Sequence, residues 1–394
     1  MNILMFDWKI FGKKDIIYAF EKIGHNVTSV ETELVMERFS KRFDCMFEEL
    51  ITKKEYQLVF TINYSVVVSN CCNRNNIKYA CVIYDSPLVS LYSYTITNKC
   101  NYIFIFDSAL YNELKQGGIN TVYYMPLAVN TDRLDNMENT QTIKKIFECD
   151  VSFLGSMYNE KYTFYDRLKG MSDYTSGYLE GLMQAQINVY GDYFMEKLLK
   201  GRVLDELENI MPYTPNKDGI ETPQYIYANY FLARKLAEIE RYEILLKISS
   251  KYKTNLYTHN KTPDLPDINN MGSIDYYTNM PYAFRFSKIN LNITLRSIRS
   301  GIPLRAMDIM GAGGFLLTNY QEDFLKHFVP GEDYVYYESI ADCLTKCDYY
   351  LSHDEERKQI AQNGHDKVKK YHNYPLRLSQ ILEIVFAQEN SKLN

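Results

Sequence analysis

Short apolar runs alternate with amphipathic stretches along the first 130 residues. The apolar runs predict strands, and the stretches with apolar residues at every third or fourth position predict helices. We expect strands at residues 3–6, 27–30, 58–61, 79–83, 102–106 and 121–124, and helices at 15–23, 37–51, 65–73 and 109–116. This alternation is typical of a parallel sheet that crossover helices cover on both faces.

A second alternating series follows residues 126–130, which we interpret as a crossing between domains. It begins with an apolar run at 150–156 and continues into a helical insertion, with helical spacing from about 161 to 207 and another helix at 227–250. Strands are then expected at 255–257, 289–293, 315–318 and 334–337. Helices at 340–351, 354–371 and about 375–388 complete the chain.

These patterns predict two Rossmann-like domains. At 394 residues the chain exceeds the usual size of a single core. We expect a first domain at 1–130 and a second at 148–372, with the helical insertion at about 161–250. The remaining residues, 373–394, are expected to form a C-terminal helix that returns to the first domain.

Composition and charge narrow the classes of function. A net charge of −5 argues against a nucleic-acid surface, which needs a broad basic face. The eight cysteines include no C-x-x-C pair, so we interpret them as reduced thiols of a cytoplasmic protein. No apolar run approaches the roughly 18 residues that span a bilayer. The first apolar run is short and interrupted by charges, unlike a signal peptide.

The segment from Asn292 to Asn319 carries the clearest chemistry. The turn Ser300-Gly301-Ile302 lets backbone N–H groups approach a ligand, and Pro303 starts a helix at no hydrogen-bond cost. The N-terminus of that helix, at about 304–310, is a ready anion site. We therefore expect this turn to hold the diphosphate of a nucleotide.

Charged and small residues flank the turn. The cationic forks of Arg296, Arg299 and Arg305 are suited to phosphate, although surface ion pairing is the alternative for each. Asp308 follows Arg305 by one helical turn, where a carboxylate is placed to bind a ribose. Two further glycines, Gly313 and Gly314, link the helix to the next strand.

Other candidates follow predicted strands, whose carboxyl ends bind ligands in open α/β sheets. Gly155 and Ser156 end the first strand of the second domain, and Tyr257 ends another strand, at an edge that can meet a nucleobase or ribose. Asp85 follows a strand of the first domain and is a candidate base for an acceptor hydroxyl. Its alternative role is to cap the following turn.

Nothing in the sequence indicates a metal site. The six histidines show no metal-binding spacing, and no D-x-D pair occurs. We expect arginines and helix N–H groups, rather than a cation, to neutralise the bound diphosphate.

The pattern G-I-P-L-R, then an acid, then G-G-F-L-L-T-N resembles the C-terminal half-site of GT-B glycosyltransferases, in the CgeB-like, spore-maturation branch. The resemblance extends over nearly the whole chain, including ILMFDWKIFGKKDII, VIYDSPLVSLYSY, IFIFDSALY and YYMPLAVNTDRLD. Ser300 and Asp308 stand where many retaining members of the wider superfamily carry two glutamates.

The resemblance implies two Rossmann-like domains facing across a cleft, with the donor on the C-terminal domain and the acceptor on the N-terminal one. It implies a bacterial hexosyltransferase-like enzyme (EC 2.4) that uses a nucleotide-sugar, a UDP-sugar, as substrate and needs no cofactor. The acceptor, whether protein, glycan or small molecule, is not identified by the sequence. Asp85 and Arg305 are then the expected catalytic residues, and the expected donor-binding residues are Gly155, Ser156, Tyr257, Arg296, Arg299, Ser300, Gly301, Ile302, Arg305, Asp308, Gly313 and Gly314.

Two alternatives remain open at this point. One is a nucleotide-sugar epimerase of the same architecture, which would interconvert the donor without an acceptor. The other is a surface or coat maturation protein that keeps the fold but binds without catalysis. Binding of UDP, followed by a donor-hydrolysis assay, would separate them.

Overall fold

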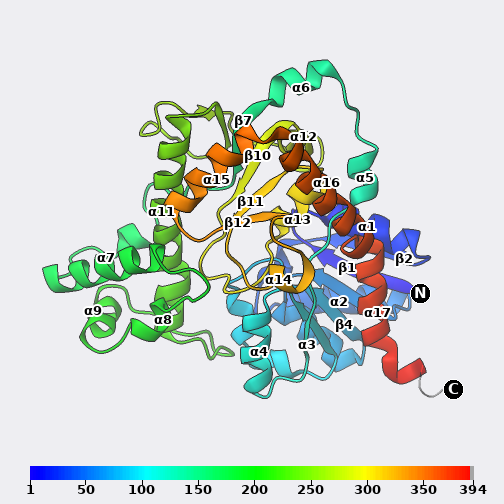
Figure 1. Cartoon of the computed structure of the whole chain (residues 1–394). Helices are drawn as coiled ribbons and strands as arrows, with labels where there is room; N and C mark the ends of the chain where they lie inside the picture. Colours follow the sequence, from blue (N-terminus) through cyan, green and yellow to red (C-terminus); the bar gives the residue numbers. More distant parts are fainter. Residues whose placement is uncertain (391–394) are drawn as a thin grey trace. The chain divides into compact units, whose positions relative to one another are not determined.

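The computed structural model describes residues 1–390, with side chains up to residue 387. The chain divides into two compact units (Figure 1). Among the described residues, the first unit contains Met1–Asn130, Pro215–Glu221 and residues 371–390. The second unit contains Thr131–Thr214 and Thr222–Lys370.

The first unit is built on a six-stranded parallel sheet in the order β2-β1-β3-β4-β5-β6. Apolar side chains on both faces of β1 and β3 are buried, as expected for a sheet with helices on each side. Because the strands are parallel, their carboxyl ends meet at one edge. The strands are β1 Asn2–Asp7, β2 Asn26–Glu31, β3 Leu58–Ile62, β4 Lys78–Val82, β5 Asn101–Ile105 and β6 Val122–Tyr124.

Side-chain caps begin several helices of this unit. Ser40 Oγ accepts a hydrogen bond from Phe43 N at the start of α2, and Asp107 accepts from the N–H groups of Ala109 and Leu110 at the start of α4. The last helix packs against the first one. The helices are α1 Lys13–Lys22, α2 Lys41–Lys53, α3 Val66–Asn75, α4 Ser108–Gln116 and α17 Tyr374–Asn390, with short turns η1 Glu33–Met36, η2 Val89–Tyr92 and η3 Tyr94–Thr97.

The second unit contains another six-stranded parallel sheet, in the order β12-β11-β10-β7-β8-β9. Its core is formed by the apolar faces of β7, β10 and β11 together with α11 and α15. The strands are β7 Cys149–Leu154, β8 Thr254–Tyr257, β9 Asn269–Asn270, β10 Ser287–Asn292, β11 Leu316–Asn319 and β12 Val335–Tyr337.

Helices cover this sheet, and a helical group lies along one end of the long helix α11 (Figure 1). That group consists of α7 Asp173–Ile187, α8 Met195–Leu198, α9 Arg202–Ile210, α10 Pro223–Ile226 and the π-helix η5 Tyr227–Leu232, which runs into α11 Ala233–Ser249. The remaining helices are α5 Thr131–Asp135, α6 Gln141–Phe147, η4 Tyr165–Arg167, α12 Met280–Phe286, α13 Leu304–Gly311, α14 Phe324–His327, α15 Ile340–Ser352 and α16 Asp354–Tyr371.

The expected fold class, two parallel α/β sheets with crossover helices, is confirmed. The helical insertion differs in detail, because the predicted helical stretch at 161–207 is broken into short helices. Gly191 and Gly201 have positive φ angles of 80° and 55° between these helices, a conformation that a continuing helix does not allow. The two-residue strand β9 is polar and was not predicted.

Residues 215–221 leave the helical insertion and join the first unit. Asp218 Oδ2 lies 2.9 Å from Arg38 Nη1 and accepts a hydrogen bond from Ser93 Oγ at 2.5 Å. Tyr94 N donates to the Asp218 carbonyl at 2.9 Å. Residues 215–221 thus belong to the first unit, although more than 80 residues of the second unit separate them from Asn130.

Candidate functional site

Helix α13 starts at the carboxyl edge of the second sheet. The strand β10 ends at Asn292, and the following loop leads through Pro303, with φ −69° and ψ 154°, into α13. The next loop along the edge supports it, because Asp323 N donates to the Ser300 carbonyl at 3.0 Å and Gln321 Nε2 donates to the Ile298 carbonyl at 3.2 Å. The helix N-terminus therefore lies where open α/β sheets bind ligands.

Side chains of the turn before α13 are buried within the unit. Ser300 is 2% exposed, and its Oγ donates to Asp323 Oδ2 at 3.2 Å. Ile302 is 1% exposed, Gly301 is buried, and Arg299 is half-buried. A ligand at this turn would therefore meet backbone groups of Ser300, Gly301 and Ile302 rather than their side chains.

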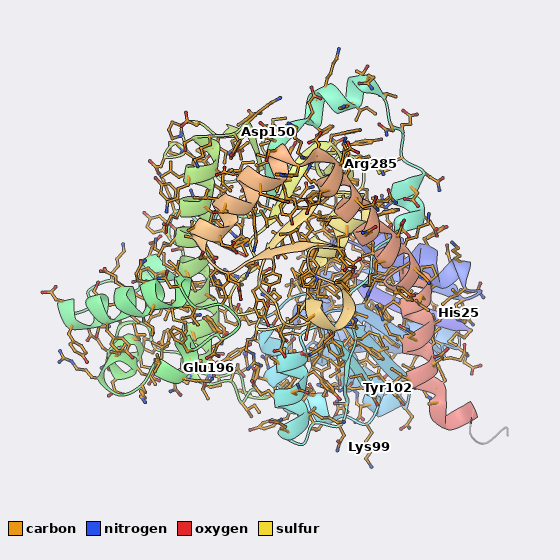
Figure 2. The ribbon with its side chains drawn as sticks, viewed as in Figure 1. His25, Lys99, Tyr102, Asp150, Glu196 and Arg285 are labelled. Carbon is orange, nitrogen blue, oxygen red and sulfur yellow. The ribbon has the colours of Figure 1, made fainter. Side chains whose placement is uncertain are left out.

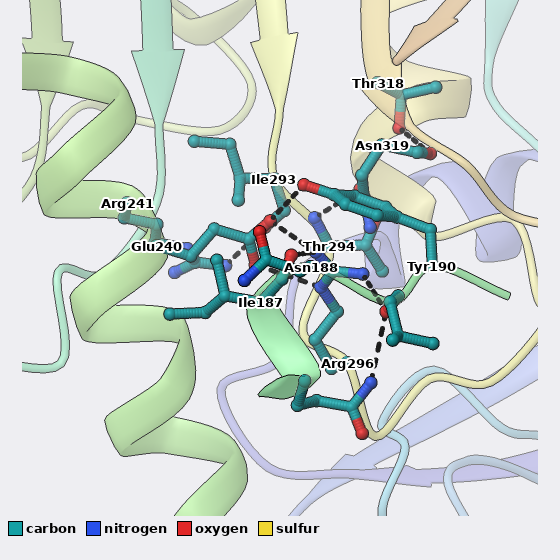
Figure 3. A network of polar contacts seen from close by, with 12 residues as sticks. Ile187, Asn188, Tyr190, Glu240, Arg241, Ile293, Thr294, Arg296, Thr318 and Asn319 are labelled. Atoms are coloured by element: carbon teal, nitrogen blue, oxygen red, sulfur yellow. Dashed lines mark hydrogen bonds and ion pairs between the residues drawn. The ribbon is translucent and has the colours of Figure 1, made fainter. Parts of the chain in front are cut away.

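Arg296 is part of a buried polar network (Figure 3). Its Nη2 lies 2.7 Å from Glu240 Oε1, and its Nε lies 3.0 Å from Glu240 Oε2. The guanidinium also stacks on Tyr190, 3.6 Å from the ring centroid, and donates to the Val189 and Ile187 carbonyls. Glu240 is fully buried, and this pairing raises the pKa of Arg296 against the opposing effect of its burial. The cation expected to meet phosphate is thus committed to a partner inside the unit.

Arg305 and Asp308 lie together on α13. Arg305 Nη1 is 3.7 Å from Asp308 Oδ2 and 2.6 Å from the sulfur of Met280, and the guanidinium lies 5.5 Å from the Phe284 ring centroid. The side chain thus lies against α12. Burial lowers the pKa of Arg305, while the nearby Asp308 raises it.

The Asp308 carboxylate is 4% exposed and accepts a hydrogen bond from the hydroxyl of Tyr276 at 3.1 Å. Tyr276 comes from the loop between β9 and α12, and its ring contacts the neighbouring ring of Tyr277 edge-on. The Arg133 guanidinium lies 5.7 Å and 5.2 Å from the centroids of these two rings. An aromatic and cationic wall therefore adjoins the carboxylate, which suits a ribose with its base.

Arg241 on α11 connects the ends of two neighbouring strands. Its Nη1 donates to the Ser156 carbonyl after β7, and its Nη2 donates to the Ile293 carbonyl after β10 at 2.8 Å. The guanidinium also lies over the rings of Phe153 and Tyr158. A buried arginine thus holds its charge at the carboxyl edge with no carboxylate partner among the described residues.

Several buried polar atoms at this edge have no hydrogen-bond partner within the described chain. They are Arg241 Nε, Ser297 Oγ, Asn319 Nδ2 and Gln321 Oε1. Asn319 ends β11, and its amide oxygen is used by Thr294 N at 2.9 Å. Because buried polar groups are nearly always paired, such a cluster indicates a place for bound water or a polar ligand.

Gly155 and Ser156 lie at the same edge. The Gly155 N–H donates to the Tyr257 carbonyl at 3.2 Å, and a Cβ on Gly155 would lie 3.7 Å from Arg241 Nη1. The Ser156 hydroxyl faces Glu160 and Asn260, each at 3.2 Å. The loop after β7 thus lies beside Arg241, and Gly155 and Ser156 are at the carboxyl end of the strand, as expected from the sequence.

Tyr257 points into the core. Its side chain is 3% exposed and packs with Phe147 and Ala283, and burial raises the pKa of its hydroxyl to about 12. A nucleobase at this strand end would meet the Tyr257 backbone rather than its ring.

Gly313 and Gly314 lie at the opposite edge of the sheet. The helix α13 spans eight residues, or about 12 Å, and carries the chain from the carboxyl edge to the start of β11. Gly314 is close-packed, since a Cβ there would lie 2.6 Å from Asn290 Nδ2 and 2.8 Å from the Phe284 carbonyl oxygen. The structure therefore separates these two glycines from the other expected donor-binding residues.

Asp85 lies at the carboxyl edge of the first sheet, where Asn63 orients it. Asn63 Nδ2 donates to Asp85 Oδ2 at 2.6 Å, and Asn63 Oδ1 accepts from the N–H groups of Asp85 and Tyr84 at 3.0 Å and 2.8 Å. Solvent reaches Asp85, yet the surrounding protein displaces part of its water and raises its pKa, which the bond from Asn63 opposes. Asp85 thus has an ordered and accessible carboxylate.

Two further features concern metal ions and membranes. No group of three or more His, Cys, Asp or Glu side chains in this part of the chain could hold a metal ion. No helix among residues 1–390 is both long and apolar enough to cross a membrane.

Comparison with known proteins shows that this architecture is the GT-B fold. Residues 231–383 match the sequence profile of the family described as "Glycosyl transferase-like". No curated protein matches the sequence.

Solved structures share the fold over nearly the whole chain. HepE from Anabaena, crystallised with UDP and glucose, has 8% identity and a TM-score of 0.56 over 98% of this chain and 100% of its own. Sucrose-phosphate synthase from Thermosynechococcus elongatus has 10% identity and a TM-score of 0.56 over the same shares. A glycosyltransferase from Rickettsia africae has 12% identity and a TM-score of 0.54 over 98% of each chain. At these identities the likeness shows the GT-B fold alone.

The sequence did not reveal four residues that the structure brings to these edges. Arg241 lies in a charged helical stretch that reads as a solvated face, and Tyr276 lies in a loop without a motif. Asn319 ends an apolar strand, and its position alone gave a signal, because strand ends collect ligand-binding residues. Asn63 also follows a strand, and its left-handed backbone, with φ 61°, has no sequence signature beyond the residue type.

Proposed function

We propose that this protein is a glycosyltransferase that transfers a sugar from a UDP-sugar to a hydroxyl of its acceptor. The observation that carries the proposal is the carboxyl edge of the second sheet. There the N-terminus of α13, the buried charge of Arg241 and the carboxylate of Asp308 accompany polar atoms that lack partners. This set suits a nucleoside diphosphate, which needs N–H donors and cations for phosphate and an acceptor for ribose hydroxyls.

We assign the ribose to Asp308 and the diphosphate to the α13 N-terminus with Arg305 and Arg241. Arg305 is the second residue of α13, and its side chain lies against Met280 of α12 in the structure. Asp308 uses one oxygen for Tyr276, which holds the carboxylate in place. The UDP and glucose bound by HepE, which shares the fold, make UDP-glucose the first donor to test.

We assign deprotonation of the acceptor hydroxyl to Asp85 of the first unit. A base must reach the proton that it removes, and Asp85 is accessible and oriented by Asn63. In the transfer, the acceptor oxygen forms a bond to the anomeric carbon, the bond from that carbon to the diphosphate breaks, and UDP leaves with the electron pair. The acceptor proton goes to Asp85, and arginine and helix N–H groups stabilise the negative charge on UDP.

Titration calorimetry with UDP tests the donor site. Asp308→Ala should weaken UDP binding by roughly ten- to hundredfold, the cost of losing hydrogen bonds to a charged acceptor. Asp366→Ala, which removes an exposed carboxylate from α16, is the matched control and should bind as the wild type does. Thermal unfolding of both variants distinguishes loss of binding from loss of folding.

A donor-turnover assay then separates the possible activities. Slow hydrolysis of UDP-glucose, with release of UDP and glucose, supports the transferase. Isomerised donor sugar would instead indicate an epimerase. Absence of UDP binding by the folded wild type would contradict the proposal and favour a non-catalytic role.

A further inference from the structure

A cavity of ≈ 760 Å³ opens at the amino edge of the second sheet, the end opposite the candidate donor site. Its floor consists of the strand starts, with Cys149 at the start of β7, Ser287 at the start of β10 and Phe315 just before β11. Because all of its lining residues belong to the second unit, the cavity is defined within that unit.

Three helices provide the walls. The segment around α6 contributes Asn139, Gln141 and Lys144, and the end of α12 contributes Arg285. The first turns of α16 contribute the third wall. Figure 2 labels Asp150 and Arg285, two of the lining residues, at the same end of this unit. The cavity thus lies beyond the amino ends of the strands, with no residue of the α13 N-terminus in its lining.

The lining carries an excess of positive charge in a protein whose net charge is −5. Its six cationic residues are Lys144, Lys253, Arg285, Lys288, Arg357 and Lys358, against the three acids Glu148, Asp150 and Asp354. Two of the acids are already neutralised within the lining. Asp150 pairs with Lys288 at 2.8 Å, and Asp354 pairs with Arg357 at 2.6 Å.

Three of the cations have no carboxylate partner among the described residues. The guanidinium of Arg285 donates only to carbonyl oxygens, to Leu134 at 2.6 Å and to Ala312 at 3.3 Å, so its charge is held in place but not neutralised. The ammonium groups of Lys144 and Lys253 have neither a hydrogen bond nor an ion pair in this part of the chain. These two lysines are therefore available to a ligand.

We propose that this cavity binds a soluble small molecule that carries phosphate groups. The volume falls within the range of roughly 300–1,000 Å³ that is usual for small-molecule sites. Lysine ammonium groups are established phosphate binders, and the side-chain amides of Asn139 and Gln141 add donors at the rim. Since the cavity and the donor site lie at opposite edges of the sheet, both can be occupied at once. The proposal does not depend on the proposed glycosyl transfer.

Inorganic pyrophosphate is the probe, titrated at fixed ionic strength into protein saturated with UDP. The UDP occupies the donor site, so any remaining saturable binding reports a second site. The double variant Lys144→Ala/Lys253→Ala should bind pyrophosphate at least about tenfold more weakly. The matched control is Lys145→Ala/Lys251→Ala, which makes the same change of charge at exposed neighbouring lysines outside the cavity and should bind as the wild type does.

Two results of the titration would overturn the assignment. One is the absence of saturable pyrophosphate binding in the presence of UDP. The other is equal weakening of pyrophosphate binding by both double variants, which would indicate non-specific attraction. Co-sedimentation with vesicles containing phosphatidic acid forms a second arm. Lysine-dependent binding to vesicles without binding of pyrophosphate would contradict a soluble ligand. If UDP does not bind at all, the proposed function fails, while the comparison of the two lysine variants still decides this site.

Discussion

Asn63 and Asp85 act as one unit because a single amide makes three hydrogen bonds to the strand end after β4. The Asn63 side chain contacts both the carboxylate and the backbone that carries it, so it sets where Asp85 points as well as how readily it ionises. The role of one side chain therefore depends on the neighbour that binds it. Arg296 is a second case, because its positive charge is paired with Glu240 rather than with a ligand.

Asn63→Gly should shift the acid limb of the pH–activity profile to higher pH. The protein raises the pKa of Asp85, and the bond from Asn63 lowers it, so removing that bond raises the pKa further. Because a base must be ionised, the variant should lose activity at a higher pH than the wild type does when the solution is made more acidic. Glycine tolerates the φ of 61° at position 63, so the backbone of that residue is kept. The profile of transfer rate against pH measures the shift.

Asn76→Gly is the matched control, because Asn76 is also left-handed, with φ 52°, but ends α3 away from Asp85. It should leave the profile unchanged.

Asp85→Asn should lower transfer by roughly 10²–10⁴-fold while UDP affinity is kept. A normal rate for Asp85→Asn would show that Asp85 only caps the turn and that another group, such as the leaving phosphate, takes the proton.

Arg296→Met should reduce the free energy of unfolding by about 3–5 kcal/mol, because it leaves the buried carboxylate of Glu240 without its cation. Denaturant unfolding measures this loss. The double variant Arg296→Met/Glu240→Met removes both charges and should recover most of the stability. If Arg296→Met instead weakens UDP binding and leaves stability unchanged, Arg296 contacts the donor, as its position in the sequence suggests.

At the scale of elements, the strand–loop–helix unit of β10 and α13 was largely predictable from the sequence. The apolar run, the turn and Pro303 specify local backbone geometry, and these signals lie within a few residues of one another. The direction of the side chains was not predictable, because it depends on partners far along the chain. Glu240, for example, lies 56 residues from Arg296. The position of Gly314 at the opposite edge is different, because it follows from the length of α13.

Gly314→Ala should destabilise the protein by at least about 1–3 kcal/mol, since the added Cβ would overlap Asn290 Nδ2 and the Phe284 carbonyl oxygen. Gly181→Ala in α7 is the control, because a Cβ there meets nothing within 4 Å. In a helix interior that substitution should stabilise the protein by up to about 1 kcal/mol. Thermal unfolding compares the two, and equal stability would show that the start of β11 has room that its packing does not indicate.

At the scale of the whole molecule, the two sheets and the division into two units follow from the alternation of strands and helices. The path of the chain between the units does not. Residues 215–221 are polar and carry no apolar pattern, and their place in the first unit rests on contacts such as Arg38 with Asp218, 180 residues apart. Hydrophobic periodicity predicts which segments pack, but it cannot predict a buried ion pair between distant loops.

Because the second unit has its own positive groups for a diphosphate, we expect transfer not to require a divalent cation. In the proposed site, the N-terminus of α13, Arg305 and Arg241 neutralise the nucleotide diphosphate. Activity after exhaustive treatment with EDTA should therefore equal that of the untreated protein, whereas Arg305→Ala should raise the donor KM and lower kcat, because both bound donor and departing UDP lose a partner. Full loss of activity on chelation, restored by magnesium or manganese, would show that a cation performs the task assigned here to arginine and helix N–H groups.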